Sequence, residues 1–137
     1  MAKKLSHHDA LIYVMVTMSA VDRSMTDAEL QRIGNIVSQL PVFSDYDVDG
    51  LVSAAEACGK AISAKDGLTK TLDLIAASLP EKLHETAYAL ALEIAAADLK
   101  VEQEELRYLE LLRDKLKLSK LVVAAIERGA RARHMRA

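Results

Sequence analysis

Four acidic residues stand at matching positions in two halves of the chain. Asp22 is followed seven residues later by Glu29, and Asp98 is followed seven residues later by Glu105. Carboxylate oxygens are the ligands that hard cations such as Ca²⁺, Mg²⁺ and Mn²⁺ prefer. Like charges that are held close together also need a compensating cation or proton. The spacing therefore predicts a divalent-metal site formed by these four carboxylates.

Each pair of acids lies at the junction of two predicted helices. The aspartate ends an alanine-rich apolar helix and the glutamate falls in the first turn of the next one, so both carboxylates can overhang one short turn. A shift of 76 residues aligns the two pairs together with the apolar positions around them. We therefore predict a duplicated helical hairpin with halves at about 8–40 and 84–116. The sequence leaves open whether the two turns approach each other or lie apart.

Helix capping is the competing explanation for the two glutamates. Thr26 precedes Glu29 by three residues, which is the spacing of a capping box. Acidic side chains in the first turn of a helix also interact favourably with the helix dipole. Asp22 and Asp98 are harder to explain in this way, because a carboxylate near the end of a helix opposes the dipole unless a partner compensates it. The metal prediction therefore depends mainly on the aspartates.

Composition and periodicity predict an all-α fold of about seven helices in one domain, residues 1–137. The chain has five Gly, two Pro and no Trp, and apolar residues recur at helical spacing. Residues 10–21 and 83–98 are apolar or small on most sides, which predicts two central helices that pack together. Gly59 is expected to end the third helix. Further apolar stripes are expected on the sixth helix (Leu106, Leu109, Leu112, Leu116) and on the seventh, which Ser119 caps (Leu121, Val122, Ala125, Ile126).

A second acidic motif lies in the loop that follows Pro41. The segment DYDVDGLVSAAE places Asp45, Asp47, Asp49 and Glu56 at the coordinating positions of an EF-hand loop. Pro41 interrupts the entering helix that an EF-hand requires. The alternative is a loop in which Asp47 or Asp49 caps the next helix. Calcium binding by residues 45–56 is kept as an alternative hypothesis.

The charge pattern and the missing motifs limit the function classes. The net charge of −2 gives no reason to expect nucleic-acid binding, and the basic residues of the tail, 128–137, are expected to form a solvated helix end. A single cysteine, Cys58, and the lack of a signal core or a membrane-spanning run predict a cytoplasmic protein without membrane insertion. No nucleophile elbow or phosphate loop is present, so we expect no enzymatic activity.

The two turn sequences, AVDRSMTDAE and AADLKVEQEE, resemble those of the TerB (tellurite-resistance) family over roughly residues 11–118. The resemblance implies a duplicated helical bundle, a link to tellurite and other chemical stress, and metal-ligand roles for Asp22, Glu29, Asp98 and Glu105. It also implies a protein partner, such as a TerC-type membrane protein. The alternative function is a metal-free helical scaffold that binds another protein or forms a homodimer.

Overall fold

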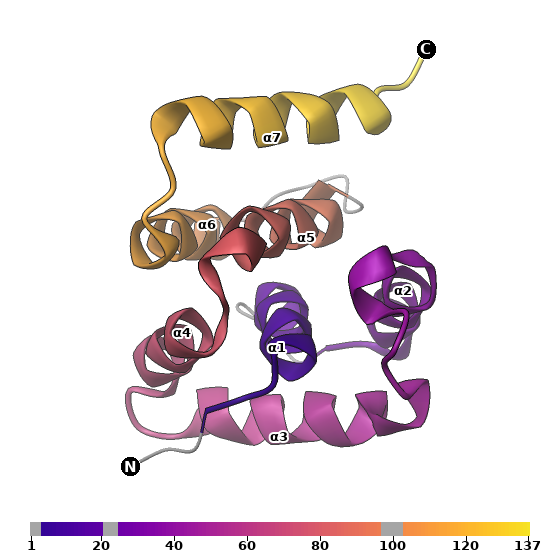
Figure 1. The fold of residues 1–137 in the computed structure, drawn as a ribbon, viewed down its shortest axis with the longest axis vertical. Coiled ribbons are helices and arrows are strands. Elements are labelled where there is room, and N and C mark those ends of the chain that lie inside the picture. Colours follow the sequence, from indigo (N-terminus) through magenta and orange to yellow (C-terminus); the bar gives the residue numbers. More distant parts are fainter. Residues whose placement is uncertain (1–3, 21–24, 97–102) are drawn as a thin grey trace.

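The computed structural model describes residues 4–20, 25–96 and 103–137 (Figure 1). In these ranges the chain forms seven α-helices, three short 3₁₀ helices and no β-strand, which confirms the predicted all-α class. The α-helices are α1 (His7–Ala20), α2 (Asp27–Gln39), α3 (Leu51–Ser63), α4 (Gly67–Ser78), α5 (His84–Ala96), α6 (Gln103–Leu116) and α7 (Lys120–Arg133). The 3₁₀ helices are η1 (Pro41–Phe43), η2 (Val48–Gly50) and η3 (Glu81–Leu83).

Helices α1 and α5 form the centre of the molecule and pack against each other, as predicted. Every residue of α1 from Ala10 to Ser19 is buried. The buried residues of α5 include three alanines, whose small side chains let the two helices approach closely. The central position of α1 explains why it is apolar on all sides.

The other helices surround this central pair: α2 and α4 flank α1, α6 lies beside α5, and α3 and α7 lie at the two ends (Figure 1). Helix α3 lies at one end of the long axis, where it packs against α1 and α4. Helix α7 lies at the opposite end and packs on α5, and Tyr88 Oη of α5 donates a 2.6 Å hydrogen bond to Glu127 of α7. The outer faces of α3 and α7 are therefore the two ends of the molecule.

The two predicted halves begin and end their helices at equivalent positions. Adding 76 to the bounds of α1 and α2 gives 83–96 and 103–115, which lie within one residue of the bounds of α5 and α6. Capping residues set several of these boundaries as predicted. Ser6 Oγ accepts from the N–H of Asp9 at the start of α1, and Ser119 Oγ accepts from the N–H of Val122 at the start of α7. Local sequence therefore fixes where the helices begin.

Three details of the predicted helices are wrong. Helix α3 continues through Gly59 to Ser63, and the chain turns only at Asp66, whose φ of 57° is left-handed. On α6, Leu106 is 47% exposed and Tyr108 is buried instead. On α7 the buried residues are Val123 and Ala130, whereas Leu121 is 80% exposed. In α6 and α7, apolar residues occupy more than one face, and only contact with the core selects the buried one.

The turn between α3 and α4 brings Gly67 against the end of α3. A Cβ atom built on Gly67 would lie 2.3 Å from the carbonyl oxygen of Ala61 and 2.7 Å from that of Ile62. Both neighbours are backbone atoms, so they cannot move aside by a change of rotamer. Gly67 is therefore required by the close approach of α4 to α3.

A small polar cluster lies inside the core between α1, α3 and α6. Thr17 Oγ1 donates to the carbonyl of Tyr13 at 2.6 Å and lies 3.5 Å from Cys58 Sγ. Tyr108 Oη donates to the carbonyl of Val14 at 3.3 Å. Burial raises the pKa of the Cys58 thiol to about 11, although the hydrogen bond with Thr17 opposes this shift. Cys58 is thus a buried, neutral thiol.

Helix α6 ends in a Schellman motif that places a lysine in the left-handed region. Lys117 has a φ of 55°, its N–H donates to Asp114, and the N–H of Leu118 donates to Arg113. Lys117→Gly is expected to raise the free energy of unfolding by about 1 kcal/mol, because glycine adopts this conformation without a steric penalty. Urea unfolding followed by circular dichroism measures the change. Lys117→Ala is the control, and a glycine variant no more stable than the alanine variant would contradict the prediction.

Candidate metal centre

The structure describes two of the four predicted metal ligands. Glu29 and Glu105 lie in the first turns of α2 and α6. Asp22 and Asp98 lie outside the described residues, so their positions relative to the glutamates stay a prediction. Both glutamates are buried, with exposed fractions of 5% and 6%. They are the only buried acidic side chains in the described part of the chain.

Glu29 forms the capping box that the sequence predicted. Its Oε1 accepts from the N–H of Thr26 at 2.9 Å, and Thr26 Oγ1 accepts from the N–H of Glu29 at 3.2 Å. This reciprocal pair holds the start of α2 in place. Capping therefore accounts for one oxygen of Glu29, and the side chain is held with its carboxylate in a fixed position.

Glu105 occupies the equivalent position in the second half, seven residues after Asp98. A carboxylate that leaves water loses a large hydration energy unless charged or hydrogen-bonding partners replace it. Most glutamates of folded proteins are exposed for this reason. Burial of the same residue type at both repeat positions therefore sets these two glutamates apart from the other acidic residues of the described chain.

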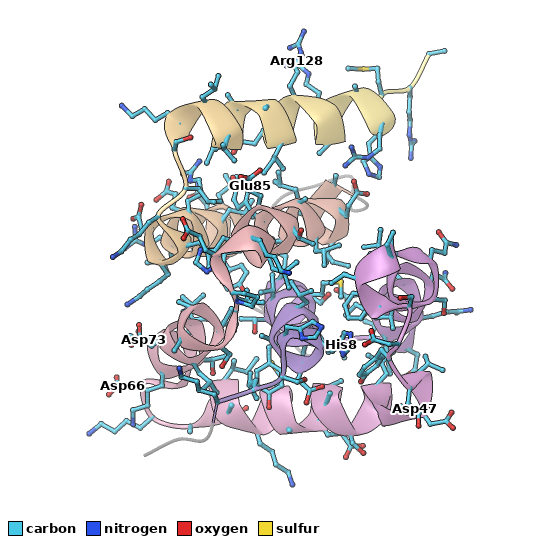
Figure 2. All side chains as sticks on the ribbon, viewed as in Figure 1. His8, Asp47, Asp66, Asp73, Glu85 and Arg128 are labelled. Atoms are coloured by element: carbon cyan, nitrogen blue, oxygen red, sulfur yellow. The ribbon has the colours of Figure 1, made fainter. Side chains whose placement is uncertain are left out.

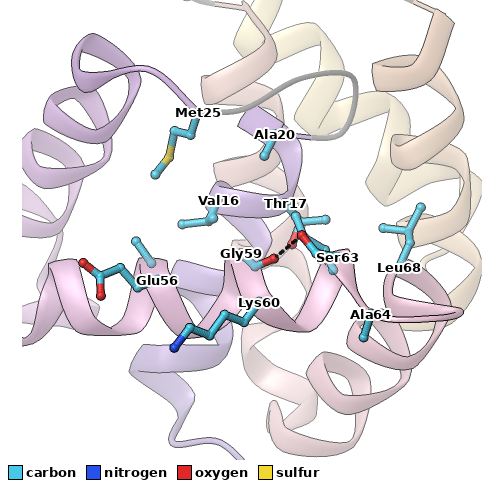
Figure 3. A pocket seen from close by; sticks show the side chains of 12 residues that line it. Val16, Thr17, Ala20, Met25, Glu56, Gly59, Lys60, Ser63, Ala64 and Leu68 are labelled. Atoms are coloured by element: carbon cyan, nitrogen blue, oxygen red, sulfur yellow. Dashed lines mark hydrogen bonds between the residues drawn. The ribbon is translucent and has the colours of Figure 1, made fainter.

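The residues that flank the two acidic turns border neighbouring grooves. Ala20 and Met25, on either side of the first turn, line a groove of about 960 Å³ with Leu68 of α4 (Figure 3). Gln103 and Glu104, which follow the second turn, line a smaller groove that also includes Leu68. Leu68 of α4 thus lines both grooves.

One buried polar atom close in sequence to Asp22 has no partner in the described structure. The Ser19 hydroxyl is in the last turn of α1, is 4% exposed, and has no hydrogen bond with residues 4–20, 25–96 or 103–137. Carboxylate and hydroxyl oxygens make up a donor set that suits a hard divalent cation. The residues near the acidic turns therefore fit such an ion in their chemistry. Within the described ranges, no three His, Cys, Asp or Glu side chains are grouped closely enough to bind a metal.

Residues 45–56 do not adopt the EF-hand arrangement, which corrects that alternative. Val48–Gly50 form η2, and α3 already begins at Leu51, before the last coordinating positions. Asp47 caps η2 by accepting from the N–H of Asp49 at 3.0 Å, as the competing hypothesis predicted. Asp45 pairs with His8 Nε2 at 3.1 Å. Asp47 and Glu56 line two different grooves, so the motif does not converge on one ion.

The basic tail is partly integrated into the fold, which also differs from the prediction. Helix α7 extends to Arg133. Arg133 forms an ion pair with Glu93 of α5, and His134 Nε2 lies 3.0 Å from the same carboxylate. The tail is therefore an exposed helix end that contacts α5 through Arg133 and His134, both of which reach the Glu93 carboxylate.

The larger groove is a feature that the sequence analysis missed. One wall is formed by α3, where the small residues Ala55, Gly59 and Ser63 recur every four residues; Figure 3 shows Gly59 and Ser63 on this helix. A Cβ atom built on Gly59 would meet no other atom within 4 Å. The spacing of these small residues was a usable signal, but Gly59 was interpreted as a helix end.

The fold and the acidic turns define a small helical domain made of two equivalent hairpins, each with a buried glutamate at the start of its second helix. The model of the family described as "Tellurite resistance protein TerB" matches residues 8–128. The chain belongs to this family. No curated protein and no solved structure shows a significant match to the chain. No helix in the described ranges is both long enough and apolar enough to cross a lipid bilayer.

Proposed function

We propose that this TerB-family chain is a non-enzymatic, cytoplasmic module that binds one divalent cation at its two acidic turns in the response to tellurite or other chemical stress. Asp22, Glu29, Asp98 and Glu105 would hold the ion. The cation would balance the negative charge of the four carboxylates. A TerC-type membrane protein is the proposed partner of the loaded module.

The observation that carries this proposal is the burial of Glu29 and Glu105 at equivalent positions. A buried carboxylate is stabilised by a nearby cation, and two of them at repeated positions are consistent with a shared ligand. The Ser19 hydroxyl, which has no hydrogen bond with a described residue, and the groove lined by Ala20 and Met25 support a ligand beside the first turn. The proposed ion is hard and oxygen-preferring because every proposed donor is an oxygen.

Calorimetric titration with Ca²⁺, Mg²⁺ and Mn²⁺ tests the proposal. Wild type is expected to bind at least one of them, and Asp22→Asn/Asp98→Asn is expected to bind it about tenfold more weakly or worse, because two ligand charges are lost. Thermal unfolding gives a second readout, since an ion at a hundred times its Kd stabilises the folded state by about 2.7 kcal/mol.

The matched control is Asp47→Asn/Asp49→Asn, which removes the same charge from the η2 loop and is expected to titrate like wild type. If wild type and Asp22→Asn/Asp98→Asn give identical titrations, these aspartates are not ligands. If only the η2 variant loses binding, the ion is held by the loop and the proposed site is wrong.

The groove favours a second function from a different class, a metal-free scaffold that binds another protein. Its walls are mostly apolar or small, and it lies beside Ala20 and Met25 at the first acidic turn. An apolar surface in this position is typical of a protein-binding site. A titration in which none of the three cations gives heat would select this function over metal binding.

A further inference from the structure

The positive charge of the chain is concentrated in its last 21 residues. Residues 117–137 contain six Lys and Arg residues and one acidic residue, so their net charge is +5. The remaining 116 residues have a net charge of −7, which gives the whole chain its net charge of −2. Residues 117–137 include α7, the outermost helix at one end of the long axis (Figure 1). The near-neutral total therefore conceals a basic C-terminal segment on an otherwise acidic chain.

The outer face of α7 combines unpaired cations with exposed apolar side chains. Leu121 is 80% exposed and Met135 is 63% exposed. Arg128 and Arg131 are exposed, and Arg128 projects away from the body of the protein (Figure 2). Neither arginine forms an ion pair with a described residue, in contrast to Arg133. We call Leu121, Arg128, Arg131, Met135 and Arg136 the basic patch.

The start of α3 carries the complementary combination at the other end. Asp47, Val48 and Asp49 form the turn that leads into α3, and Val52 and Glu56 are one helical turn apart on its exposed side. Val48 and Val52 are about half exposed, and Asp47 marks this end of the molecule in Figure 2. We call Asp47, Val48, Asp49, Val52 and Glu56 the acidic patch. Four of the five exposed large hydrophobic residues of the described chain belong to these two patches.

We propose that the chain self-associates head to tail, with the basic patch of one copy docking on the acidic patch of the next. Opposite charges steer the two surfaces together, and the apolar residues between them provide area to bury. Because the two patches lie at opposite ends of the long axis, the contact joins two different surfaces. A pair of copies therefore still has one free basic patch and one free acidic patch. Such a heterologous contact repeats, so it extends beyond a dimer.

Sedimentation velocity from about 10 µM to about 1 mM covers the range in which small interfaces of this kind dissociate. At about 50 mM salt the weight-average mass of wild type is expected to rise from the monomer's 15.0 kDa past twice that value. At about 500 mM salt the rise is expected to shrink severalfold, because the ion pairs are screened.

Two variants with one disabled patch each make the test specific. Leu121→Gln/Arg128→Gln/Arg131→Gln disables the basic patch, and Asp47→Asn/Val52→Gln/Asp49→Asn disables the acidic patch while keeping an oxygen at the η2 cap. Each variant alone is expected to stay monomeric. An equimolar mixture retains one intact patch of each kind and is expected to stop at a one-to-one dimer. Lys65→Gln/Lys70→Gln, which neutralises two exposed lysines elsewhere, is the matched control and should associate like wild type.

Wild type that remains at 15.0 kDa throughout the low-salt series overturns the proposal. A mixture of the two patch variants that stays monomeric also overturns it, as does a basic-patch variant that associates like wild type. If a monomeric wild type instead binds vesicles of anionic lipid and the basic-patch variant does not, α7 faces a membrane and head-to-tail association is wrong. None of these outcomes depends on whether the acidic turns bind a cation.

Discussion

Gly67→Ala is expected to lower the free energy of unfolding by about 3 kcal/mol or more, which corresponds to a Tm lower by roughly 10 °C. The new methyl group would lie 2.3 Å from the Ala61 carbonyl oxygen, far inside van der Waals contact. Relief requires α4 to move away from α3. That movement would disturb buried Leu72 and Ile75, which place α4 against the core.

Gly59→Ala is the matched control, because it adds the same methyl group one helix earlier. Its new Cβ would contact nothing within 4 Å, and Gly59 lies inside α3 without a positive φ. Replacing an interior helical glycine by alanine is expected to raise the free energy of unfolding by about 0.5–1 kcal/mol. The two variants should therefore shift urea unfolding curves in opposite directions. Equal stability of the two variants would show that the α3–α4 packing described above is wrong.

Cys58 in the folded protein is expected to react with a thiol reagent such as Ellman's reagent at least about a hundredfold more slowly than an exposed cysteine. The reactive species is the thiolate, and burial raises the pKa of Cys58 from 9.0 to about 11, so the thiolate fraction near pH 8 falls by about two orders of magnitude. The side chain is also completely buried, which blocks the reagent. Absorbance of the released thiolate gives the rate.

The variant Ala57→Cys/Cys58→Ala is the control, since it moves the thiol by one residue to an exposed position on α3. It is expected to react at the rate of a free thiol, as is wild type in concentrated urea.

The raised pKa of Cys58 also has a consequence for the stability of the protein. Above pH 9 the unfolded thiol ionises while the folded thiol stays neutral, so the Cys58 contribution to stability declines as the pH rises from 9 through about 11. Fast labelling of native wild type would contradict the burial of this residue.

The positions of the helices could be predicted from local signals because those signals act within a few residues. Thr26 and Glu29 satisfy the first N–H groups of α2 wherever the helix lies in the fold, and Pro41 cannot continue it. The central placement of α1 also followed from sequence, because a helix that is apolar on all sides has no face to present to water.

Which face of a peripheral helix is buried could not be predicted in the same way. In α7, Leu121 and Val123 are both apolar, and contact with α5 determines that Val123 is buried. The burial of Glu29 and Glu105 was also not predicted. Hydropathy patterns place a glutamate at the surface, and only the way in which several helices close over the first turn removes it from water.

The sequence suggested the residue types of the candidate site, and the structure adds where two of those residues lie. The 76-residue repeat identified Glu29 and Glu105 as equivalent, and both occupy first turns. The EF-hand pattern shows the opposite case, in which spacing alone matched a motif that the chain does not form. Asp45 is engaged by His8, and this contact joins residues 37 positions apart that no local pattern connects.

The capping box at Glu29 makes the stability of the N-terminal end of α2 depend on any ligand that binds at its first turn. Oε1 of Glu29 already holds the N–H of Thr26, so a cation that draws on the same oxygen must compete with that hydrogen bond or share the atom with it. Binding of the cation then changes how readily the first turn of α2 frays, and fraying of this turn changes the affinity for the cation by the same factor. Amide hydrogen exchange at Thr26 would change as the ligand concentration rises, even though Thr26 itself contributes no charge.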